Sequence, residues 1–376
     1  MTTLEVRDLV KDFSLRSGLR HARFRAVDRV SFTLVPGRTV ALVGESGSGK
    51  STVARVIARL EKPTAGTVTA VDADGGRIGG RAYRHHVQMV FQDPFASLNP
   101  FHTVEHHLVR PLKLHGRAHG REDLRRRAEQ LLERVNLTPA ASVAGRRPHE
   151  LSGGQRQRVA IARALAPGAR VVIADEPVSM LDVSIRLGVL NLLARLQRED
   201  RLAVLYITHD LATARHFSDE ILVMYRGRVV ERGAADDVIL TPRHPYTRLL
   251  AAAAPDPESG RGRAELLAGN GAPEPATATP PPADSGCAFR DRCPHAMEIC
   301  SRPVPEHTAG AGERSHTALC WLYADEARGA RPAPAGTGAA TGAAPDTAGR
   351  ARTGAATDTP TNTPTDTAGR GGTAER

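Results

Sequence analysis

A glycine-rich segment that follows an apolar run constrains this chain more than any other feature. Residues 39–43, TVALV, predict a buried strand, and residues 44–51, GESGSGKS, match the pattern G-x-x-x-x-G-K-[S/T]. The helical pattern STVARVIARL begins at Ser51. A strand, a glycine-rich loop and a helix start, in that order, form a loop whose backbone N–H groups surround a phosphate. The segment therefore predicts a nucleoside-triphosphate site in an α/β fold.

The residue types in this loop suit that chemistry. Gly44, Gly47 and Gly49 let the backbone come close to the phosphates, and the helix N-terminus adds partial positive charge. Lys50 supplies a cation for the β- and γ-phosphates, and Ser51 supplies an oxygen for Mg²⁺. A plain glycine-rich turn before a helix is the alternative. The preceding strand, the lysine and the hydroxyl together argue against it.

A second apolar run ends in two carboxylates. Residues 171–176 read VVIADE, so a buried strand brings Asp175 to its C-terminal edge, where α/β sheets bind ligands. We expect Asp175 to anchor Mg²⁺, and Glu176, on the other face of the strand end, to polarise the attacking water. Two acidic residues that cap the next loop are the alternative, which the phosphate-binding loop makes the weaker one.

A second anion site is predicted about 100 residues after the first. Residues 151–158 read LSGGQRQR, in which Ser152 is a natural N-cap and Gly153 and Gly154 expose backbone amides at a helix start. One nucleotide has no obvious need for two such sites in one chain. Two chains that face each other head to tail do need them, with each helix start capping the γ-phosphate held by the other chain.

The motifs of residues 1–250 together resemble those of the ABC-transporter ATPases. In order they are GESGSGKST at 44–52, FQD with Gln92, LSGGQ at 151–155, VVIADEP at 171–177, SMLD at 179–182 and THD with His209. The resemblance implies a P-loop NTPase fold of class α/β, with a parallel-sheet core, an antiparallel β subdomain and a helical subdomain at about 93–168. The alternation of strand-like runs with helical patterns is typical of such a sheet.

The resemblance also implies roles for single residues. Glu176 is the expected catalytic base, and His209 is expected to contact the γ-phosphate, although read alone it suits an ordinary edge histidine. Gln92 is expected to sense Mg²⁺ and the membrane partner, and Asp182 to lie in a loop that crosses the dimer. Mg²⁺ is expected at Ser51, Gln92 and Asp175. The residues expected to bind ATP are Phe13, Gly44, Glu45, Ser46, Gly47, Ser48, Gly49, Lys50, Ser51, Thr52 and Gln92.

Two of these assignments need comment. Phe13 stands at about the place of an aromatic that stacks on adenine, where the family more often has Tyr, and the Arg-rich insert at 16–25 blurs the alignment. The signature residues are expected to contact the ATP of a partner subunit, and they are Ser152, Gly153, Gly154 and Gln155.

A narrower resemblance covers more of the chain. MVFQDPFASLNP at 89–100, VSMLDVSIRLGVLNLL at 178–193 and HPYTRLLAAAAP at 244–255 are similar to the ATPases of oligopeptide, dipeptide and nickel importers. Met180 stands where that group commonly has Ala. The cysteine-containing region, GCAFRDRCPHAMEIC followed by HTALC, is similar to the C-terminal extension of the same group.

All four cysteines lie in that region, spaced Cys287-x5-Cys293-x6-Cys300-x19-Cys320. This spacing lacks the C-x2–4-C knuckles of structural zinc, and four thiolates on irregular loops suit an iron–sulfur cluster better. The resemblance implies a [4Fe–4S] cluster. Zinc and four free thiols in a small core are the alternatives.

The composition changes along the chain and predicts four parts. Residues 1–254 are the expected ATPase domain, residues 255–286 a Pro/Gly-rich linker, and residues 287–323 the cysteine-rich extension. Residues 324–376 lose bulky apolar side chains, so we expect a disordered tail.

Charge and hydropathy exclude other classes of protein. The formal net charge is +10, but no nucleic-acid recognition motif accompanies it. No run approaches the roughly 20 apolar residues of a membrane span, and the N-terminus does not resemble a signal peptide. We therefore expect a peripheral protein on the cytoplasmic face of the membrane. Its expected partners are two permease subunits, a second ATPase subunit of the same or a related chain, and indirectly an extracytoplasmic solute-binding protein.

The predicted function is ATP hydrolysis that energises import of oligopeptides or dipeptides. Import of nickel or another small solute is an alternative, as is an exporter. A soluble ABC ATPase that acts on nucleic acid or ribosomes is a further one, but the chain has neither a long coiled-coil insert nor a second ATPase copy.

Overall fold

The structure is a computed structural model that describes residues 2–17, 20–253, 286–309 and 315–324. All of these belong to one compact unit, residues 1–331. Residues 255–285 of the predicted linker (255–286) and residues 325–376 of the predicted tail (324–376) lie outside the described residues.

An eight-stranded sheet forms the centre of this unit, in the order β11-β12-β10-β9-β3-β8-β7-β6. Its parallel strands are rich in Val, Ile and Leu, as expected for strands covered on both faces. They are β3 (Thr39–Val43), β6 (Val87–Val90), β7 (Val171–Asp175), β8 (Ala203–Thr208) and β9 (Glu220–Tyr225). The antiparallel ones are β10 (Arg228–Ala234), β11 (Glu306–Ala309) and β12 (His316–Leu319).

The order of the parallel strands determines where the site lies. In β3 and β8, Val43 pairs with Thr208, and in β7 and β8, Asp175 pairs with Ile207. The C-terminal ends of β3, β7 and β8 therefore lie side by side at one edge of the sheet. The loops that leave this edge carry the predicted phosphate loop, the acidic pair and His209.

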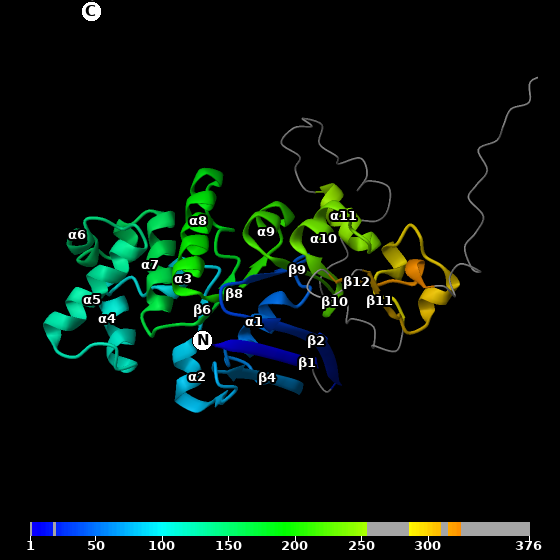
Figure 1. The fold of residues 1–376 in the computed structure, drawn as a ribbon, viewed down its shortest axis with the longest axis horizontal. Coiled ribbons are helices and arrows are strands. Elements are labelled where there is room, and N and C mark those ends of the chain that lie inside the picture. Colours follow the sequence, from blue (N-terminus) through cyan, green and yellow to red (C-terminus); the bar gives the residue numbers. More distant parts are fainter. Residues whose placement is uncertain (1, 18–19, 254–285, 310–314, 325–376) are drawn as a thin grey trace, which may run out of the picture. The chain divides into compact units, whose positions relative to one another are not determined.

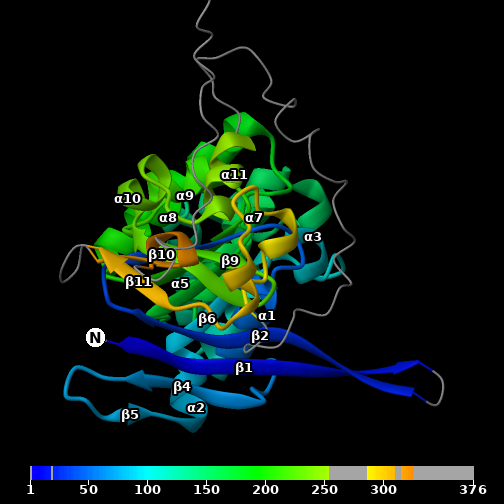
Figure 2. The same cartoon turned by 90° about the vertical axis from the view of Figure 1, so that its right-hand side faces the viewer.

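A four-stranded antiparallel sheet, in the order β2-β1-β4-β5, packs against the central one. It consists of β1 (Thr3–Ser17), β2 (Arg20–Leu34), β4 (Ala65–Val71) and β5 (Arg77–Ile78). Figure 2 shows β1 and β2 running together well beyond β4. Their pairing continues from Leu4 opposite Leu34 to Ser17 opposite Arg20. The described residues of the Arg-rich insert, 16–17 and 20–25, thus lie in the far end of a long hairpin.

Helices follow most of the strands. Those that follow strands of the central sheet are α1 (Lys50–Ile57), α8 (Val183–Asp200), α9 (Leu211–Phe217) and α10 (Ala235–Leu240), while α2 (Gly80–His86) lies between β5 and β6 and α11 (Pro245–Ala253) comes after α10. A further group gathers beyond β6 (Figure 1) and comprises α3 (Pro94–Ser97), α4 (Val104–Leu114), α5 (Arg121–Arg134), α6 (Ala140–Ala144), the 3₁₀ turn η1 (Pro148–Glu150) and α7 (Gly153–Leu165).

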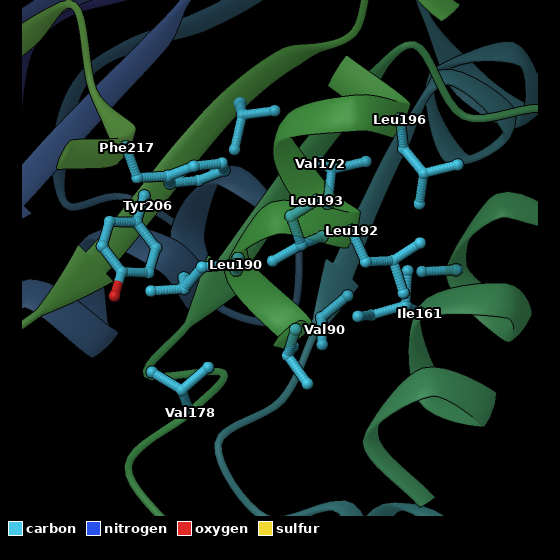
Figure 3. Packing of buried hydrophobic residues seen from close by; sticks show 14 of the residues in the cluster. Val90, Ile161, Val172, Val178, Leu190, Leu192, Leu193, Leu196, Tyr206 and Phe217 are labelled. Atoms are coloured by element: carbon cyan, nitrogen blue, oxygen red, sulfur yellow. The ribbon is translucent and has the colours of Figure 1, made fainter. Parts of the chain in front are cut away.

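The larger core joins this helical group to the sheet. Figure 3 shows Leu190 and Leu193 of α8, Val172 of β7 and Ile161 of α7 in one cluster of buried side chains. All four are at most 3% exposed. Burial of one such side chain stabilises the fold by about 1.5–3 kcal/mol. The packed helices therefore hold the sheet edge in a fixed place.

The pattern EILVMYRGRVVERG at residues 220–233 predicts a hairpin that turns at Arg226–Gly227, and β9 and β10 form this hairpin. Tyr225 pairs with Arg228, and the two turn residues have φ of 42° and 82°. Positive φ at both positions is typical of a type I′ turn, which matches the twist of the strands. This prediction is confirmed.

The last described part, residues 286–309 and 315–324, is called here the cysteine-rich segment. It contains short 3₁₀ turns, η3 (Arg290–Arg292), η4 (Glu298–Ser301) and η6 (Trp321–Tyr323), in addition to β11 and β12. The pairs Glu231–Ala318 and Arg232–Thr317 join β12 to β10. The central sheet therefore crosses the predicted boundary at residue 254.

Candidate functional site

The predicted phosphate loop wraps around its own lysine. Lys50 Nζ donates hydrogen bonds to the carbonyl oxygens of Gly44 and Glu45, both at 2.8 Å. The side chain is buried, and burial lowers the pKa of Lys50, while the nearby carboxylates of Glu176 and Asp175 oppose that shift. The ammonium thus lies at the centre of the loop, near where we predict the phosphates.

Two glycines of the loop have no room for a side chain. A Cβ on Gly44, whose φ is +157°, would lie 2.1 Å from the carbonyl oxygen of Met224. A Cβ on Gly49, with φ +105°, would lie 2.3 Å from the carbonyl oxygen of Ala26. The loop can therefore pack against β9 and the hairpin only with glycine at these positions.

The hydroxyl and the carboxylate predicted to hold Mg²⁺ lie together. Ser51 Oγ, in the first turn of α1, donates to Asp175 Oδ1 at 3.1 Å. Asp175 is buried at the end of β7, and burial raises its pKa, against the effect of the Ser51 hydrogen bond. Oxygen ligands of this type suit Mg²⁺, which would also compensate the buried charge.

Glu176 lies beside two other residues that were predicted to belong to the site. Gln92 Nε2 donates to Glu176 Oε2 at 3.0 Å, and His209 Nδ1 lies 3.4 Å from the same oxygen. These side chains come from loops after β6, β7 and β8, so the sheet edge brings together residues far apart in sequence. Glu176 lies just beyond the end of β7 with φ +45°. The sequence predicts Glu176 on the opposite face of the strand end from Asp175. This expectation does not apply, because the backbone has left the strand conformation at Glu176.

These residues surround a cavity of about 690 Å³. It is lined by Phe13, Phe24, Ala26, Ser46, Gly47, Gly49, Lys50, Ser51, Thr52, Gln92, Glu176 and His209. Phe24 and Ala26 were not predicted. Phe24 pairs with Phe13 across the hairpin, so the register of β1 and β2 is the signal that could have identified it. Lys11 Nζ lies 4.7 Å from the centre of the Phe13 ring.

Three residues of the predicted ATP set do not line this cavity: Gly44, Glu45 and Ser48. Ser48 is buried within the loop, 3.4 Å from Lys50 Nζ. The Glu45 side chain points instead to the cysteine-rich segment, where it pairs with Arg292.

The signature residues form a capped helix start away from that cavity. Ser152 Oγ accepts from the Gln155 backbone N–H at 3.2 Å, and Gln155 Oε1 accepts from the Ser152 N–H at 3.0 Å. The predicted N-cap is confirmed. Ser152 is exposed, while a Cβ on Gly154 would lie 2.6 Å from Ile185 Cγ2. None of residues 152–155 lines the cavity.

Asp182 lies in an exposed apolar surface. It is the N-cap of α8, and the side chains of Met180, Val183 and Leu187 around it are 54%, 74% and 54% exposed. Val183 and Leu187 lie one helical turn apart and share a face. A surface of this kind is common where another subunit binds.

A second cavity, of about 760 Å³, opens on the other side of Gln92 and is called here the Gln92 groove. Its charged and aromatic lining includes Phe91, His102, His106, His107, Arg110 and Arg163. The rings of His102 and His106 stack at 4.0 Å. Most of the lining comes from α4 and α7 and the loop after β6, so the groove lies between the sheet edge and the helical group.

Cys287 and Cys300 form part of a small hydrophobic core. Cys287 donates its backbone N–H to the carbonyl of Cys300 at 2.8 Å, and Cys300 packs with Trp321. Burial raises the pKa of Cys287 to about 11 and that of Cys320 to about 12. Within the described ranges, no three His, Cys, Asp or Glu side chains are arranged to hold a metal ion. The predicted iron–sulfur site is therefore not formed in this structure, and the thiols would have to lose protons to bind metal.

Comparison with known proteins identifies the family. A family model described as ABC transporter matches residues 27–179, and one described as oligopeptide/dipeptide transporter, C-terminal region, matches residues 230–300. The oligopeptide transport ATP-binding protein AppF of Bacillus subtilis is 44% identical over 330 residues, which cover 86% of this chain and 98% of that protein. This chain belongs to the ABC transporter ATPases. The predicted family is confirmed.

Another relative and a solved structure support the same family and fold for this ABC ATPase. The di/tripeptide transport ATP-binding protein DppF of Pseudomonas aeruginosa is 43% identical over 310 residues, 81% of this chain and 94% of that one. Among solved structures, a dimeric post-hydrolysis state of the ATP-binding cassette MJ0796, bound to ADP and Pi, is 31% identical with a TM-score of 0.53. It covers 62% of this chain and 98% of its own. The predicted ABC ATPase fold is confirmed.

A further solved structure is similar to this ABC ATPase. The cbiO1 protein of Clostridium perfringens, part of the transporter complex cbiONQ, is 26% identical with a TM-score of 0.53, covering 63% of this chain and 90% of that one. Among the described helices of the ABC ATPase, none is long and apolar enough to cross a membrane.

Proposed function

We propose that this ABC ATPase energises a membrane importer of oligopeptides or dipeptides from the cytoplasmic face of the membrane. The observation that carries this proposal is the match of residues 230–300 to the C-terminal region of oligopeptide/dipeptide transporters. The names of the relatives at 43–44% identity support it. Import of nickel or another small solute is the alternative, because the ATPase does not contact the solute.

The geometry supports a specific division of roles in ATP hydrolysis. Lys50 and the loop amides would bind the β- and γ-phosphates. Ser51 and Asp175, 3.1 Å apart, would hold Mg²⁺, which would neutralise the charge that develops on the phosphates. Glu176 would orient and deprotonate the attacking water. Its carboxylate is held by Gln92 at 3.0 Å and lies 3.4 Å from His209.

A second ATPase subunit, of this or a related chain, would complete the site. The capped helix start at Ser152 is exposed and lies outside its own chain's cavity. Its free amides suit the γ-phosphate bound by another subunit. The exposed apolar side chains of Met180, Val183 and Leu187 beside Asp182 would be covered in such a dimer.

Of the two permease subunits, one would dock in the Gln92 groove of each ATPase subunit, with a solute-binding protein acting through the permeases. The groove contains Arg110 and Arg163 together with exposed or half-buried apolar side chains such as Leu114, which is 65% exposed. This chemistry suits a short helix that carries apolar and acidic residues. Because Gln92 lines both this groove and the ATP cavity, a permease that moves in the groove would act on Glu176.

The cysteine-rich segment would hold a [4Fe–4S] cluster, with Cys287, Cys293, Cys300 and Cys320 as its ligands. Support comes from the chemistry of the donors: Cys287 and Cys300 pack in one small core, and burial together with charge repulsion from the Cys300 thiol raises the pKa of Cys287 and Cys293. Absorbance near 400 nm and about four irons per chain in anaerobically purified protein would support the cluster. Zinc, or metal-free protein with four reactive thiols, would contradict it.

The transport proposal is tested in proteoliposomes that contain the full-length chain, its two permeases and its solute-binding protein. We expect ATP-dependent uptake of a labelled peptide, and ATPase activity stimulated by peptide-loaded binding protein. The Glu176→Gln complex should bind the peptide-loaded protein but transport nothing. Stimulation by Ni²⁺ with no response to peptide would contradict the proposal.

A further inference from the structure

Glu45 of the phosphate loop makes a contact that phosphate binding does not require. Arg292 Nη1 and Nη2 donate to Glu45 Oε2 and Oε1, both at 3.0 Å, across 247 residues of sequence. Each nitrogen pairs with its own oxygen, so the contact is bidentate. Paired bonds of this kind fix orientation as well as distance. Arg292 belongs to the turn η3, in the cysteine-rich segment.

Aromatic rings hold the guanidinium of Arg292 in place. It lies 5.6 Å from the Phe289 ring centre and 5.9 Å from that of Tyr225. Phe289 is 1% exposed and meets Tyr225 edge to face at 5.4 Å. A cation over such rings gains electrostatic attraction and loses rotational freedom. Arg292 therefore reaches Glu45 from a preorganised position.

The backbone of Glu45 is held from the same side. Its N–H donates to Tyr246 Oη at 2.9 Å. Tyr246 is fully buried on α11, and its ring lies 5.5 Å from that of Phe289. The cluster that places Arg292 thus also places the hydroxyl that binds the Glu45 amide.

A further hydrogen bond connects Glu45 to the lysine of the phosphate loop. The Glu45 carbonyl accepts a hydrogen bond from Lys50 Nζ at 2.8 Å. Glu45 is therefore bound at its carboxylate, its N–H and its C=O, and the last of these partners is the lysine at the centre of the loop.

We propose that Arg292 is a positioning residue for the phosphate loop, and that the cysteine-rich segment strengthens ATP binding by holding Glu45. A glycine-rich loop pays conformational entropy when it closes around phosphates. A loop already held in its binding conformation loses less on binding, so its affinity is higher. The proposal concerns ATP binding alone and stands whichever solute the importer carries.

The alternative is an ion pair without consequence. The side chains of Arg292 and Glu45 are 30% and 40% exposed, and many pairs of that exposure contribute little. The two possibilities differ in what they predict for ATP, which makes them separable by experiment.

The experiment measures KM for ATP and kcat of the full-length protein, with the affinity for a non-hydrolysed ATP analogue. For Arg292→Ala we expect KM and the analogue Kd to rise about threefold to fivefold, with kcat within about twofold of the wild type. Glu45→Ala should give the same rise, and the double variant no more than either. Arg290→Ala is the matched control, since Arg290 lies in the same turn and bonds its neighbour Asp291.

Charge variants separate positioning from folding. Arg292→Lys keeps the charge but not the paired bonds, so it should recover only part of the affinity. Exchanging the charges, with Glu45→Arg and Arg292→Glu together, should recover more than either single change. If Arg292→Ala does not fold, the conservative Glu45→Gln reports on the same contact. Wild-type affinity in both Arg292→Ala and Glu45→Gln, or effects of Arg292→Ala and Glu45→Ala that add, would overturn the proposal.

Discussion

Gln92 and Glu176, 84 residues apart, share a hydrogen bond of 3.0 Å between an amide nitrogen and a carboxylate oxygen. Gln92 also lines the groove in which we place the permease. The pair therefore connects a docking surface to the carboxylate that we propose as the catalytic base. Motion of one loop, the segment after β6, would change the position of that carboxylate.

Glu176→Gln should bind ATP normally but hydrolyse it at least about 100-fold more slowly, because the amide cannot accept a proton from water. Closed dimers should accumulate with ATP and Mg²⁺, which size-exclusion chromatography would detect. Glu199→Gln, an exposed change on α8, is the control. Hydrolysis at the wild-type rate would refute our assignment of the base.

Lys50→Ala should weaken ATP binding by roughly tenfold to hundredfold, since it removes charged hydrogen bonds to the phosphates. Titration with a fluorescent ATP analogue measures the change. Lys62→Ala, on the exposed surface, should bind as the wild type does. Unchanged affinity in Lys50→Ala would mean that the ammonium does not reach the nucleotide.

Gly44→Ala should destabilise the fold by roughly 1–3 kcal/mol and abolish ATP binding, because the new methyl would meet the Met224 carbonyl at 2.1 Å. Gly79→Ala is the matched control, since its φ is −122° and a Cβ there meets nothing within 4 Å. Urea denaturation of both proteins compares the two. Equal stability of Gly44→Ala and the wild type would show that the loop can move away from β9.

Acid should destabilise the protein through His244. Burial lowers the pKa of His244 to about 4, while Glu231 opposes the shift. The folded-state pKa lies below the unfolded value of about 6.5, so the unfolded chain takes up the proton first as the pH falls. Between pH 6.5 and 4 this residue should remove roughly 3 kcal/mol of stability, and none of that loss should occur above pH 7.

His244→Gln tests this pH dependence. The variant loses hydrogen bonds and should be less stable at pH 7. Between pH 6.5 and 4, however, its free energy of unfolding should fall less steeply than that of the wild type, because unfolding takes up one proton fewer. His149→Gln, at an exposed position, should keep the wild-type slope. The same slope in all three proteins would show that His244 is not the group responsible.

Local features of the site were predictable because their chemistry is local. A loop that binds phosphate needs its glycines, lysine and hydroxyl at fixed spacing after a strand, so the segment GESGSGKS can be recognised from the sequence alone. The N-cap at Ser152 and the turn at Arg226–Gly227 follow equally from short patterns. The parallel direction of β3, β7 and β8 also follows, since α/β sheets bind ligands at the C-terminal ends of their strands.

Other features depend on contacts that have no local pattern. Phe24 reaches the ATP cavity only through the register of a long hairpin, which the Arg-rich insert obscures. The turn of the backbone at Glu176 depends on the packing around β7. Arg292 lies 247 residues from Glu45 in a segment whose cysteines suggested only metal chemistry, so their pairing could not be inferred from spacing.

The junction of β10 with β12 has a consequence for shortened versions of this chain. Glu231 on β10 is 1% exposed and accepts a hydrogen bond from the backbone of His244, while His316 on β12 lies 2.6 Å from its carboxylate. A protein truncated after Ala253 would keep that carboxylate but lose His316 and the neighbouring strand. An unpaired strand edge beside an under-compensated charge favours aggregation. We therefore expect a fragment that ends at Ala253 to aggregate more readily than one that extends to Ala324, which keeps His316 and β12 in place.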